Sequence, residues 1–305
     1  MSATPTLSFS GHETFPLRAT WLKKAYDLLV VDPTLFSHED AFVRLGVGKN
    51  MAQSLRHWGR VCGVFERTTG SSYQITDLGH ALLADTGWDP FLVTPAGRWL
   101  LHWQIAARPT QAFTWFFAFN LFRGGEVSVP LLVEQIVAYL AQHEQPRPSP
   151  ATLARDSECM LHCYAPPAPK LLAQLAEDTL ACPLTNLGLL QPIPGQGSFQ
   201  LVHGEQPDLP AALVAFAVLR WLEASGRRTA NLHDLVFAPG SPGRVFRLDE
   251  DALLARLQQL AALTDGDADF TETAGLRQVS WRQQTLALPA LVARAFVDAD
   301  EADHG

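Results

Sequence analysis

Hydrophobic residues recur at helical spacing in the first 62 residues and predict three helices. These helices cover residues 20–31, a short stretch that Ser37 would cap, and residues 49–62. The glycine turn Gly46-Val47-Gly48 separates the last two, and residues 63–67 and 73–76 read as a β-hairpin. Helix, short glycine turn, helix and hairpin is the order of a winged helix-turn-helix, here closed by a helix at residues 77–85.

The same order of elements recurs twice along the chain without sequence identity. The second set is predicted as helices at 127–143, from Ser149 onward and at 170–180, followed by a hairpin at 189–203. The third set is predicted from residues 232–237 through a turn to a helix at 249–263, followed by a hairpin of 269–273 and 276–282. The predicted fold is therefore mainly α with small β-hairpins, as tandem winged helix-turn-helix units around a helical centre. The corresponding divisions are 1–87, 88–125, 126–206 and 207–305.

Two further segments have a distinct composition. Residues 95–122 are dense in tryptophan and phenylalanine, which predicts a shared core in preference to a base-stacking platform. Residues 297–304 are acidic, and we expect them to be a disordered tail.

The distribution of charge along the chain bears on nucleic-acid binding more than the total charge does. The formal charge of −8 argues against nucleic-acid binding, yet residues 44–67 hold five basic residues and one acid. In this stretch Arg44, Lys49, Arg56 and Arg60 are candidates for phosphate contacts, and Asn50 is placed to read adenine from the start of the third helix. A solvated basic face that contacts protein is the alternative.

Basic residues outside this stretch extend the candidate DNA surface. Arg155 would contact phosphate from the helix that begins at Ser149, although an intrahelical pair with Glu158 is the alternative. Arg244 and Arg277 lie in two further basic segments, 220–247 and 277–294. Either segment could instead bind an acidic partner protein or the chain's own acidic tail.

His12 and Glu13 are the candidate catalytic residues. A histidine beside a carboxylate can act as a base and its orienting group, or hold Mg²⁺ or Mn²⁺ for phosphodiester cleavage. The alternative is that this leader docks on the core through Phe9 and Phe15, while Glu13 pairs with Arg18.

Several chemistries lack their sequence signatures. The four cysteines contain no C-x-x-C pair, so a zinc site built from Cys159, His162, Cys163 and Cys182 is disfavoured. Gly46–Lys49 does not complete a nucleotide-binding loop, and no lysine follows an acid by two positions as the common nuclease core requires. No signal peptide or membrane span is evident, and a cytoplasmic protein is expected.

Several colinear motifs resemble one bacterial family. They include FSGHETFPLR at 9–18, LGVGKNM at 45–51, APGSPGRVF at 238–246 and TAGLRQ at 273–278. With these motifs the chain is similar to the SspB-type family of DNA phosphorothioation islands, over roughly residues 9–282.

The resemblance implies DNA handling, including nicking that gives sulfur-transfer enzymes access to the backbone. The implied partners are DNA, a cysteine desulfurase, an ATPase and an ATP pyrophosphatase-like sulfur-transfer enzyme. Two alternatives stay open: a non-catalytic adaptor that recognises a sequence and recruits these enzymes, and a transcriptional regulator that binds a palindrome as a homodimer.

Overall fold

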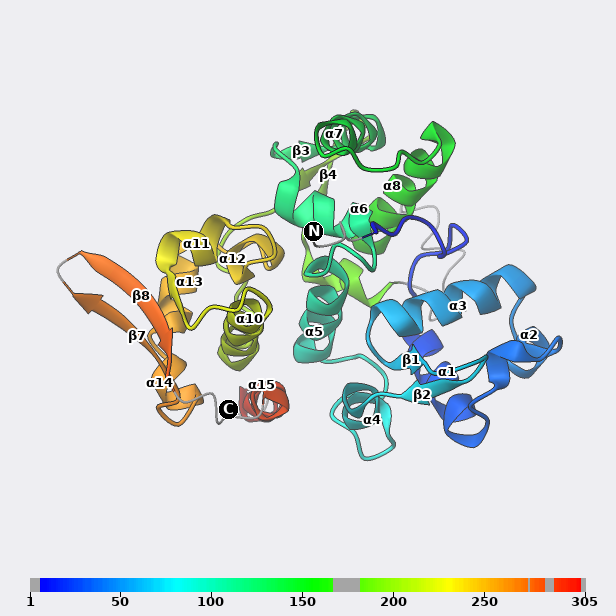
Figure 1. Cartoon of the computed structure of the whole chain (residues 1–305), viewed down its shortest axis with the longest axis horizontal. Helices are drawn as coiled ribbons and strands as arrows, with labels where there is room; N and C mark the ends of the chain where they lie inside the picture. The colour runs from blue at the N-terminus through cyan, green and yellow to red at the C-terminus, as the bar shows by residue number, and fades with distance from the viewer. Residues whose placement is uncertain (1–5, 167–181, 274, 283–287, 303–305) are drawn as a thin grey trace.

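The computed structural model describes residues 6–166, 182–273, 275–282 and 288–302 (Figure 1). The described chain is mainly helical with three small antiparallel sheets, as the sequence predicted. The helix predicted at 170–180 lies outside the described residues. No described helix is long and apolar enough to cross a bilayer.

The N-terminal elements follow the predicted order. They are α1 (Ala19–Val31), η1 (Leu35–Ser37), α2 (Ala41–Arg44), α3 (Lys49–Val61), β1 (Phe65–Arg67), β2 (Tyr73–Ile75) and α4 (Asp77–Leu83). The hairpin pairs Phe65 with Ile75, and the Thr76 hydroxyl caps α4 by accepting from Gly79 N at 2.9 Å. Ser37 was wrongly predicted as a helix cap. It ends a 3-10 turn, and its hydroxyl donates to the Thr34 carbonyl instead.

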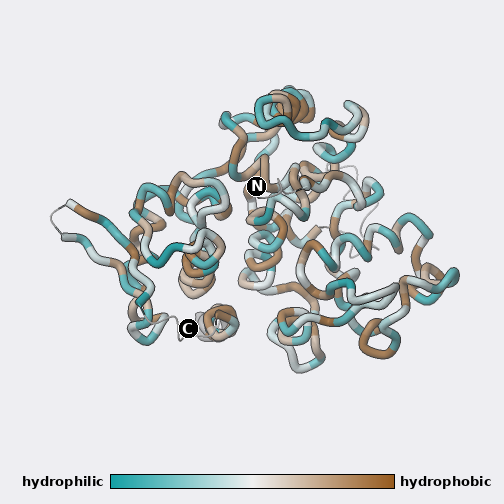
Figure 2. Tube along the Cα trace, viewed as in Figure 1, coloured by the Kyte–Doolittle hydropathy of each residue, from teal (hydrophilic) through white to brown (hydrophobic). Residues whose placement is uncertain are grey.

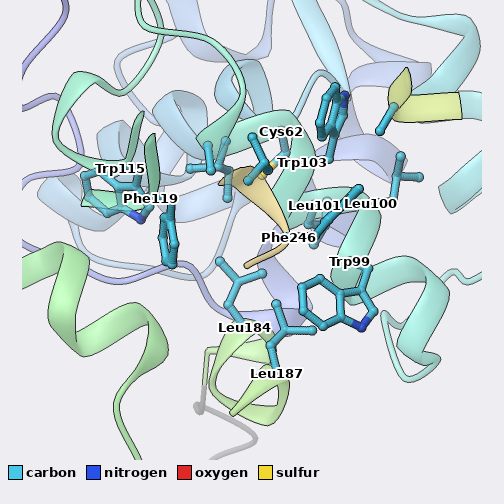
Figure 3. Packing of buried hydrophobic residues seen from close by; sticks show 14 of the residues in the cluster. Cys62, Trp99, Leu100, Leu101, Trp103, Trp115, Phe119, Leu184, Leu187 and Phe246 are labelled. Atoms are coloured by element: carbon cyan, nitrogen blue, oxygen red, sulfur yellow. The ribbon is translucent and has the colours of Figure 1, made fainter. Parts of the chain in front are cut away.

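The aromatic segment forms the centre of the molecule. It consists of α5 (Pro95–Ala106), α6 (Phe113–Phe116) and the π-helical turn η2 (Phe117–Leu121). Trp99 and Trp115 are fully buried, which confirms that this segment builds a core. Figure 3 shows Trp99 of α5 near Phe246 and Leu184, residues from two later parts of the chain. The buried hydrophobic residues from Leu17 to Phe296 belong to one cluster.

Two three-stranded sheets follow, each with one short strand and one hairpin. The first set contains β3 (Glu126–Val127), α7 (Val129–Gln142), α8 (Pro150–Tyr164), η3 (Pro183–Leu187), β4 (Leu190–Ile193) and β5 (Ser198–Leu201). Its strand order is β3-β5-β4. The helix predicted from Ser149 onward is α8, and Ser149 caps it, because its hydroxyl accepts from Thr152 N at 3.1 Å.

The second set repeats this topology with extra helices. It contains α10 (Ala211–Ala224), β6 (Thr229–Asn231), α11 (Leu232–Phe237), α12 (Pro242–Val245), α13 (Glu250–Leu257), α14 (Leu260–Leu263), β7 (Ala268–Thr273), β8 (Leu276–Trp281) and α15 (Leu288–Ala302). Its strand order is β6-β8-β7. The helix predicted at 249–263 is thus divided into α13 and α14.

The C-terminal segment corrects a prediction. Residues 297–302 were expected to be disordered, but they belong to α15. This helix is largely hydrophobic in Figure 2, and it packs against α10 and α5. Phe296 stacks on Trp88 with ring centroids 5.3 Å apart. Burial of this apolar face supplies the stability that the acidic end of the helix lacks.

Candidate nucleic-acid interface

The exposed face of α3 carries a stripe of polar and basic side chains. Lys49, Gln53, Arg56 and Arg60 are spaced 4, 3 and 4 residues apart, which places them on one side of a helix. The opposite side buries Leu55 and Trp58 in the core. No carboxylate of the described residues lies within 4.0 Å of the three basic groups. Their charge is therefore available to a ligand.

Two hollows follow this stripe and share Arg56. The first lies between α3 and the η1–α2 region and is lined by residues that include His38, Lys49 and Arg56. The second lies against the hairpin and is lined by Arg56, Arg60 and Arg67, with Ser71 and Tyr73. Glu66, the acid of this hairpin, accepts a hydrogen bond from Gln74 at 2.9 Å. Glu39 also lines the first hollow, but basic side chains outnumber acidic ones along the two hollows, which together we call the α3 surface.

A strained leader segment lies at the N-terminal end of the α3 surface. Ser10, Gly11, Glu13 and Thr14 all have φ between +49° and +93°. For residues other than glycine such angles cost energy and persist only where tertiary contacts impose them. Phe9 and Phe15 pack against the core, which is the docking that the non-catalytic alternative for this segment predicted.

The leader is held by a buried histidine and aspartate. His12 and Asp156 are 2% and 1% exposed, and His12 Nε2 lies 2.6 Å from Asp156 Oδ1. Because Thr14 N donates to His12 Nδ1 at 3.1 Å, the His12 proton sits on Nε2 and is donated to Asp156. Ser10 N and the Thr114 hydroxyl also donate to Asp156. His12 therefore has both ring nitrogens engaged and tethers the leader to α8.

A second histidine supports the leader from α3. An added Cβ on Gly11 would lie 2.6 Å from His57 Nδ1, so the leader backbone rests directly on this ring. His57 Nε2 is buried without a hydrogen-bond partner among the described residues. Burial is the main cause that lowers the pKa of His57 to about 3. His57 is therefore neutral at physiological pH.

A polar pocket opens where the leader, α3 and α8 meet. Its lining residues are Ser10, Gly11, His12, Glu13, Thr14, Asn50, Thr152, Arg155 and Asp156. Asn50 comes from the first turn of α3 and Arg155 from the second turn of α8. Glu13, Asn50 and Arg155 are exposed, and Arg155 Nε donates to the Ala151 carbonyl at 3.2 Å. The structure thus joins Glu13, Asn50 and Arg155, three residues singled out in the sequence, into what we call the leader pocket.

The remaining basic candidates lie elsewhere and differ in their partners. Arg44 forms an ion pair with Asp32 at 2.7 Å. Arg277 lies 2.9 Å from Glu272 and 3.1 Å from Glu250, and the Glu272 carboxylate raises the pKa of Arg277. Arg244 is half-buried and donates to the Phe237 carbonyl at 3.2 Å. Of these, Arg44 and Arg277 are already neutralised by this chain.

The cysteines are buried in the core. Cys62, Cys159, Cys163 and Cys182 are free thiols, and burial raises the pKa of Cys62, Cys159 and Cys182. Among the described residues, no three His, Cys, Asp or Glu side chains gather as a metal site. His162 is exposed, away from the buried sulfur atoms. These thiols act as small apolar groups in the core.

Comparison with known proteins identifies the family. Residues 9–296 match the model of the family described as protein of unknown function DUF4007. The chain belongs to this family. The fold is similar to the SspB crystal structure, with a TM-score of 0.81 and 30% identity over 97% of this chain and 87% of that chain. It is also similar to the magnesium ion-bound SspB crystal structure, with a TM-score of 0.79 and 28% identity over 97% and 96% of the two chains.

These likenesses support the SspB-type assignment that the motifs suggested. No curated protein matches the chain in sequence.

Sequence reasoning missed the groups that position the leader pocket. Thr114 and His57 had no assigned role, and Asp156 had not been connected with His12, from which it is 144 residues away. The short motif around His12 drew attention to the leader, but it gave no indication of the residues that the leader contacts. Contacts of such separation depend on the packing of α6, α3 and α8, which local patterns do not encode.

Proposed function

We propose that this chain binds the backbone of double-stranded DNA through the α3 surface, as a component of a DNA phosphorothioation system. The observation that carries the proposal is the stripe of exposed Lys49 and Arg60 and half-buried Arg56, which have no carboxylate partner among the described residues. Unneutralised basic groups on one helix face are suited to phosphate contacts and to release of DNA counterions.

The topology supports a winged-helix interpretation of this surface. In the winged helix a short strand precedes two helices and a hairpin, and it pairs with the last strand. The orders β3-β5-β4 and β6-β8-β7 both have this arrangement. The N-terminal set has the same helices and hairpin with η1 in place of the first strand. In this interpretation α3 and α8 are the two helices that such units present to DNA.

The leader pocket extends the proposed DNA path between these two helices. Asn50 and Arg155 flank it, and the first turn of α3, which has no side-chain cap, places backbone N–H groups nearby. Helix N-termini favour anions, and arginine adds a planar donor for phosphate oxygens. A DNA strand that follows α3 would therefore reach the leader pocket with its phosphate groups.

Removal of charge from the α3 surface tests this proposal. The variant Lys49→Ala/Arg56→Ala should bind a fluorescent duplex at least tenfold more weakly than the wild type in anisotropy titrations. The slope of log K against log salt should fall by about 1.8, since each lost phosphate contact contributes about 0.9. The thermal unfolding midpoint should change little, because Lys49 is exposed and half-buried Arg56 has no ion-pair partner among the described residues. Unchanged affinity and salt slope would remove α3 as the contact.

Strand cleavage at the leader pocket is a second candidate function. The specific observation is the exposed carboxylate of Glu13, held on a strained turn beside Arg155. His12 would position this turn through Asp156, since both of its nitrogens are engaged. Glu13 would then orient water or accept its proton, and Arg155 would stabilise charge on the phosphate.

A divalent metal fits this pocket only with help from the substrate. One of the similar structures is of magnesium ion-bound SspB. Mg²⁺ is often held by one or two carboxylates together with waters and substrate phosphates, so Glu13 is the residue that would hold it here. When bound, the ion would stabilise negative charge on the scissile phosphate.

Cleavage is tested with supercoiled plasmid and Mg²⁺ or Mn²⁺. The wild type should produce relaxed circles, and Glu13→Gln should reduce the rate by a factor of about 100 or more while DNA affinity is retained. Equal nicking by Glu13→Gln would remove Glu13 from the reaction. Absence of nicking by the wild type would leave a DNA-binding adaptor that recruits the cysteine desulfurase, the ATPase and the sulfur-transfer enzyme.

A further inference from the structure

Three arginines meet at the junction of the two three-stranded sets. The turn η2 packs against α12, and Gly240 N donates to Asn120 Oδ1 at 2.8 Å. Arg123 follows η2, whereas Arg244 lies in α12 and Arg247 just after it. The backbone of Arg247 is fixed by the bond from Gly204 N to its carbonyl at 2.9 Å. These contacts bring the segment that carries Arg123 close to α12, and the charge of Arg123 acts on Arg244.

No carboxylate compensates this cluster. Several arginines elsewhere in the molecule lie within 4.0 Å of an acid, at positions 44, 220, 227, 277, 282 and 294, whereas Arg56 and Arg60 of the α3 surface do not. Within the described part of the chain, Arg123, Arg244 and Arg247 have no such partner. Burial lowers the pKa of Arg244 and of Arg247; the charge of Arg123 lowers that of Arg244 as well, and the charge of Arg244 lowers that of Arg247.

Arg247 is the most unusual member. Its residue is 9% exposed, its φ is +58°, and its Nε donates to the Val202 carbonyl at 3.3 Å. A charge buried to this degree is normally paired with an opposite charge, because desolvation without compensation is costly. Burial lowers the pKa of Arg247 to about 10, so the group stays charged at neutral pH. The chain thus keeps a buried positive charge for which it provides no anion among the described residues.

We propose that Arg123, Arg244 and Arg247 form an anion site that takes a phosphate group of the DNA backbone. The source of the phosphate rests on the proposed function, whereas the anion chemistry does not. The three side chains run from exposed Arg123 through half-buried Arg244 to buried Arg247, so an oxyanion would be drawn inward from solvent. Planar guanidinium groups can donate paired hydrogen bonds to phosphate oxygens.

Inorganic phosphate tests the anion site without DNA. Phosphate should raise the thermal unfolding midpoint of the full chain, relative to chloride at equal ionic strength, because a ligand of the folded state stabilises it. The rise should be absent in Arg123→Ala/Arg244→Ala and retained in the matched control Arg277→Ala, whose guanidinium is already paired. If the double variant does not fold, Arg123→Glu replaces it, since Arg123 is exposed. No rise in the wild type, or an equal rise in the variants of the cluster, would overturn the site.

DNA titrations test the source of the phosphate. Arg123→Ala/Arg244→Ala should weaken duplex binding at least tenfold and reduce the salt slope by about 1.8. Lys49→Ala/Arg56→Ala should keep the full response to phosphate while losing DNA affinity, which separates failure of this site from failure of the α3 surface. Loss of the phosphate response with unchanged DNA binding would overturn DNA as the source.

Discussion

The α3 surface and the β7–β8 hairpin look alike in the sequence and differ in the folded chain. Both come from basic segments, 44–67 and 277–294. On the α3 surface Arg56 and Arg60 have no carboxylate within 4.0 Å among the described residues. On the hairpin Arg277 pairs with Glu272 and Glu250, and Arg282 pairs with Asp269 at 2.5 Å.

This difference shows why the net charge of a segment is a poor guide to a binding surface. The acids that neutralise Arg277 and Arg282 lie outside the basic segment, at positions 250, 269 and 272. Pairing in the hairpin brings Glu272 opposite Arg277, whereas Glu250 reaches Arg277 from α13. The α3 helix has no facing strand to do this, so its charge is left for a ligand.

The largest expected effect concerns the buried group that anchors the leader beside the α3 surface. Asp156→Ala removes the acceptor of Ser10 N, His12 and Thr114, and should lower the free energy of unfolding by about 3–5 kcal/mol. Urea denaturation followed by tryptophan fluorescence measures it. Glu158→Ala, on the exposed side of the same helix, is the control and should cost less than about 0.5 kcal/mol. Equal costs would show that the leader contributes no stability.

A pH titration sharpens the contrast between the buried histidines and the exposed arginines. Burial lowers the pKa of His57 to about 3 and that of His102 to about 4, from an ordinary value of 6.5. The unfolded chain therefore takes up these protons first, and stability should fall as the pH drops from about 6.5 to 4. Each histidine contributes a slope of about 1.4 kcal/mol per pH unit.

The variant His57→Gln isolates one of these contributions. Its unfolding free energy should fall less steeply over the same pH range, by about 1.4 kcal/mol per unit. Gln53→Ala, at a half-buried residue of the same helix that does not titrate, is the control and should keep the wild-type slope. Identical slopes for the wild type and His57→Gln would show that His57 does not titrate as its burial requires.

A smaller effect is expected at the glycine of the leader. Gly11 has φ +93°, and a Cβ there would lie 2.6 Å from His57 Nδ1. Gly11→Ala should therefore cost about 2–3 kcal/mol, from backbone strain together with displacement of the ring. Gly70→Ala, at φ +82° with nothing within 4 Å of the added Cβ, should cost about 1 kcal/mol from strain alone. A Gly11→Ala chain as stable as Gly70→Ala would mean that the leader does not rest on His57.

Local patterns predicted much of the fold because its first helices and its hairpins are encoded by short-range periodicity and turn residues. The hairpin at Phe65–Ile75 and the start of α8 after Ser149 are examples. The helix α10 was missed because nine of its residues are buried, from Ala212 to Leu222, so it lacks a polar face with a helical period. The C-terminal part of α15 was misjudged from its acidic composition, since its stability comes from the apolar face that packs on α10 and α5.

The residues of the candidate site were predicted from the sequence, but the contacts that these residues make were not. Glu13, Asn50 and Arg155 were each identified, and the structure brings them to one pocket. The sequence did not reveal that His12 is sequestered by Asp156, nor that Arg277 is neutralised. Both facts depend on which acid lies opposite which base after folding, and this is a property of tertiary packing.

The most direct test of the central claim removes two arginines from each surface and compares the salt dependence of DNA binding. Arg56→Ala/Arg60→Ala should lower the affinity for a duplex at least tenfold and reduce the slope of log K against log salt by about 1.8. Arg277→Ala/Arg282→Ala removes the same formal charge, and should leave the slope within about 0.3 of the wild type because these groups are already paired. Equal losses from both pairs, or a larger loss from the hairpin, would contradict the account.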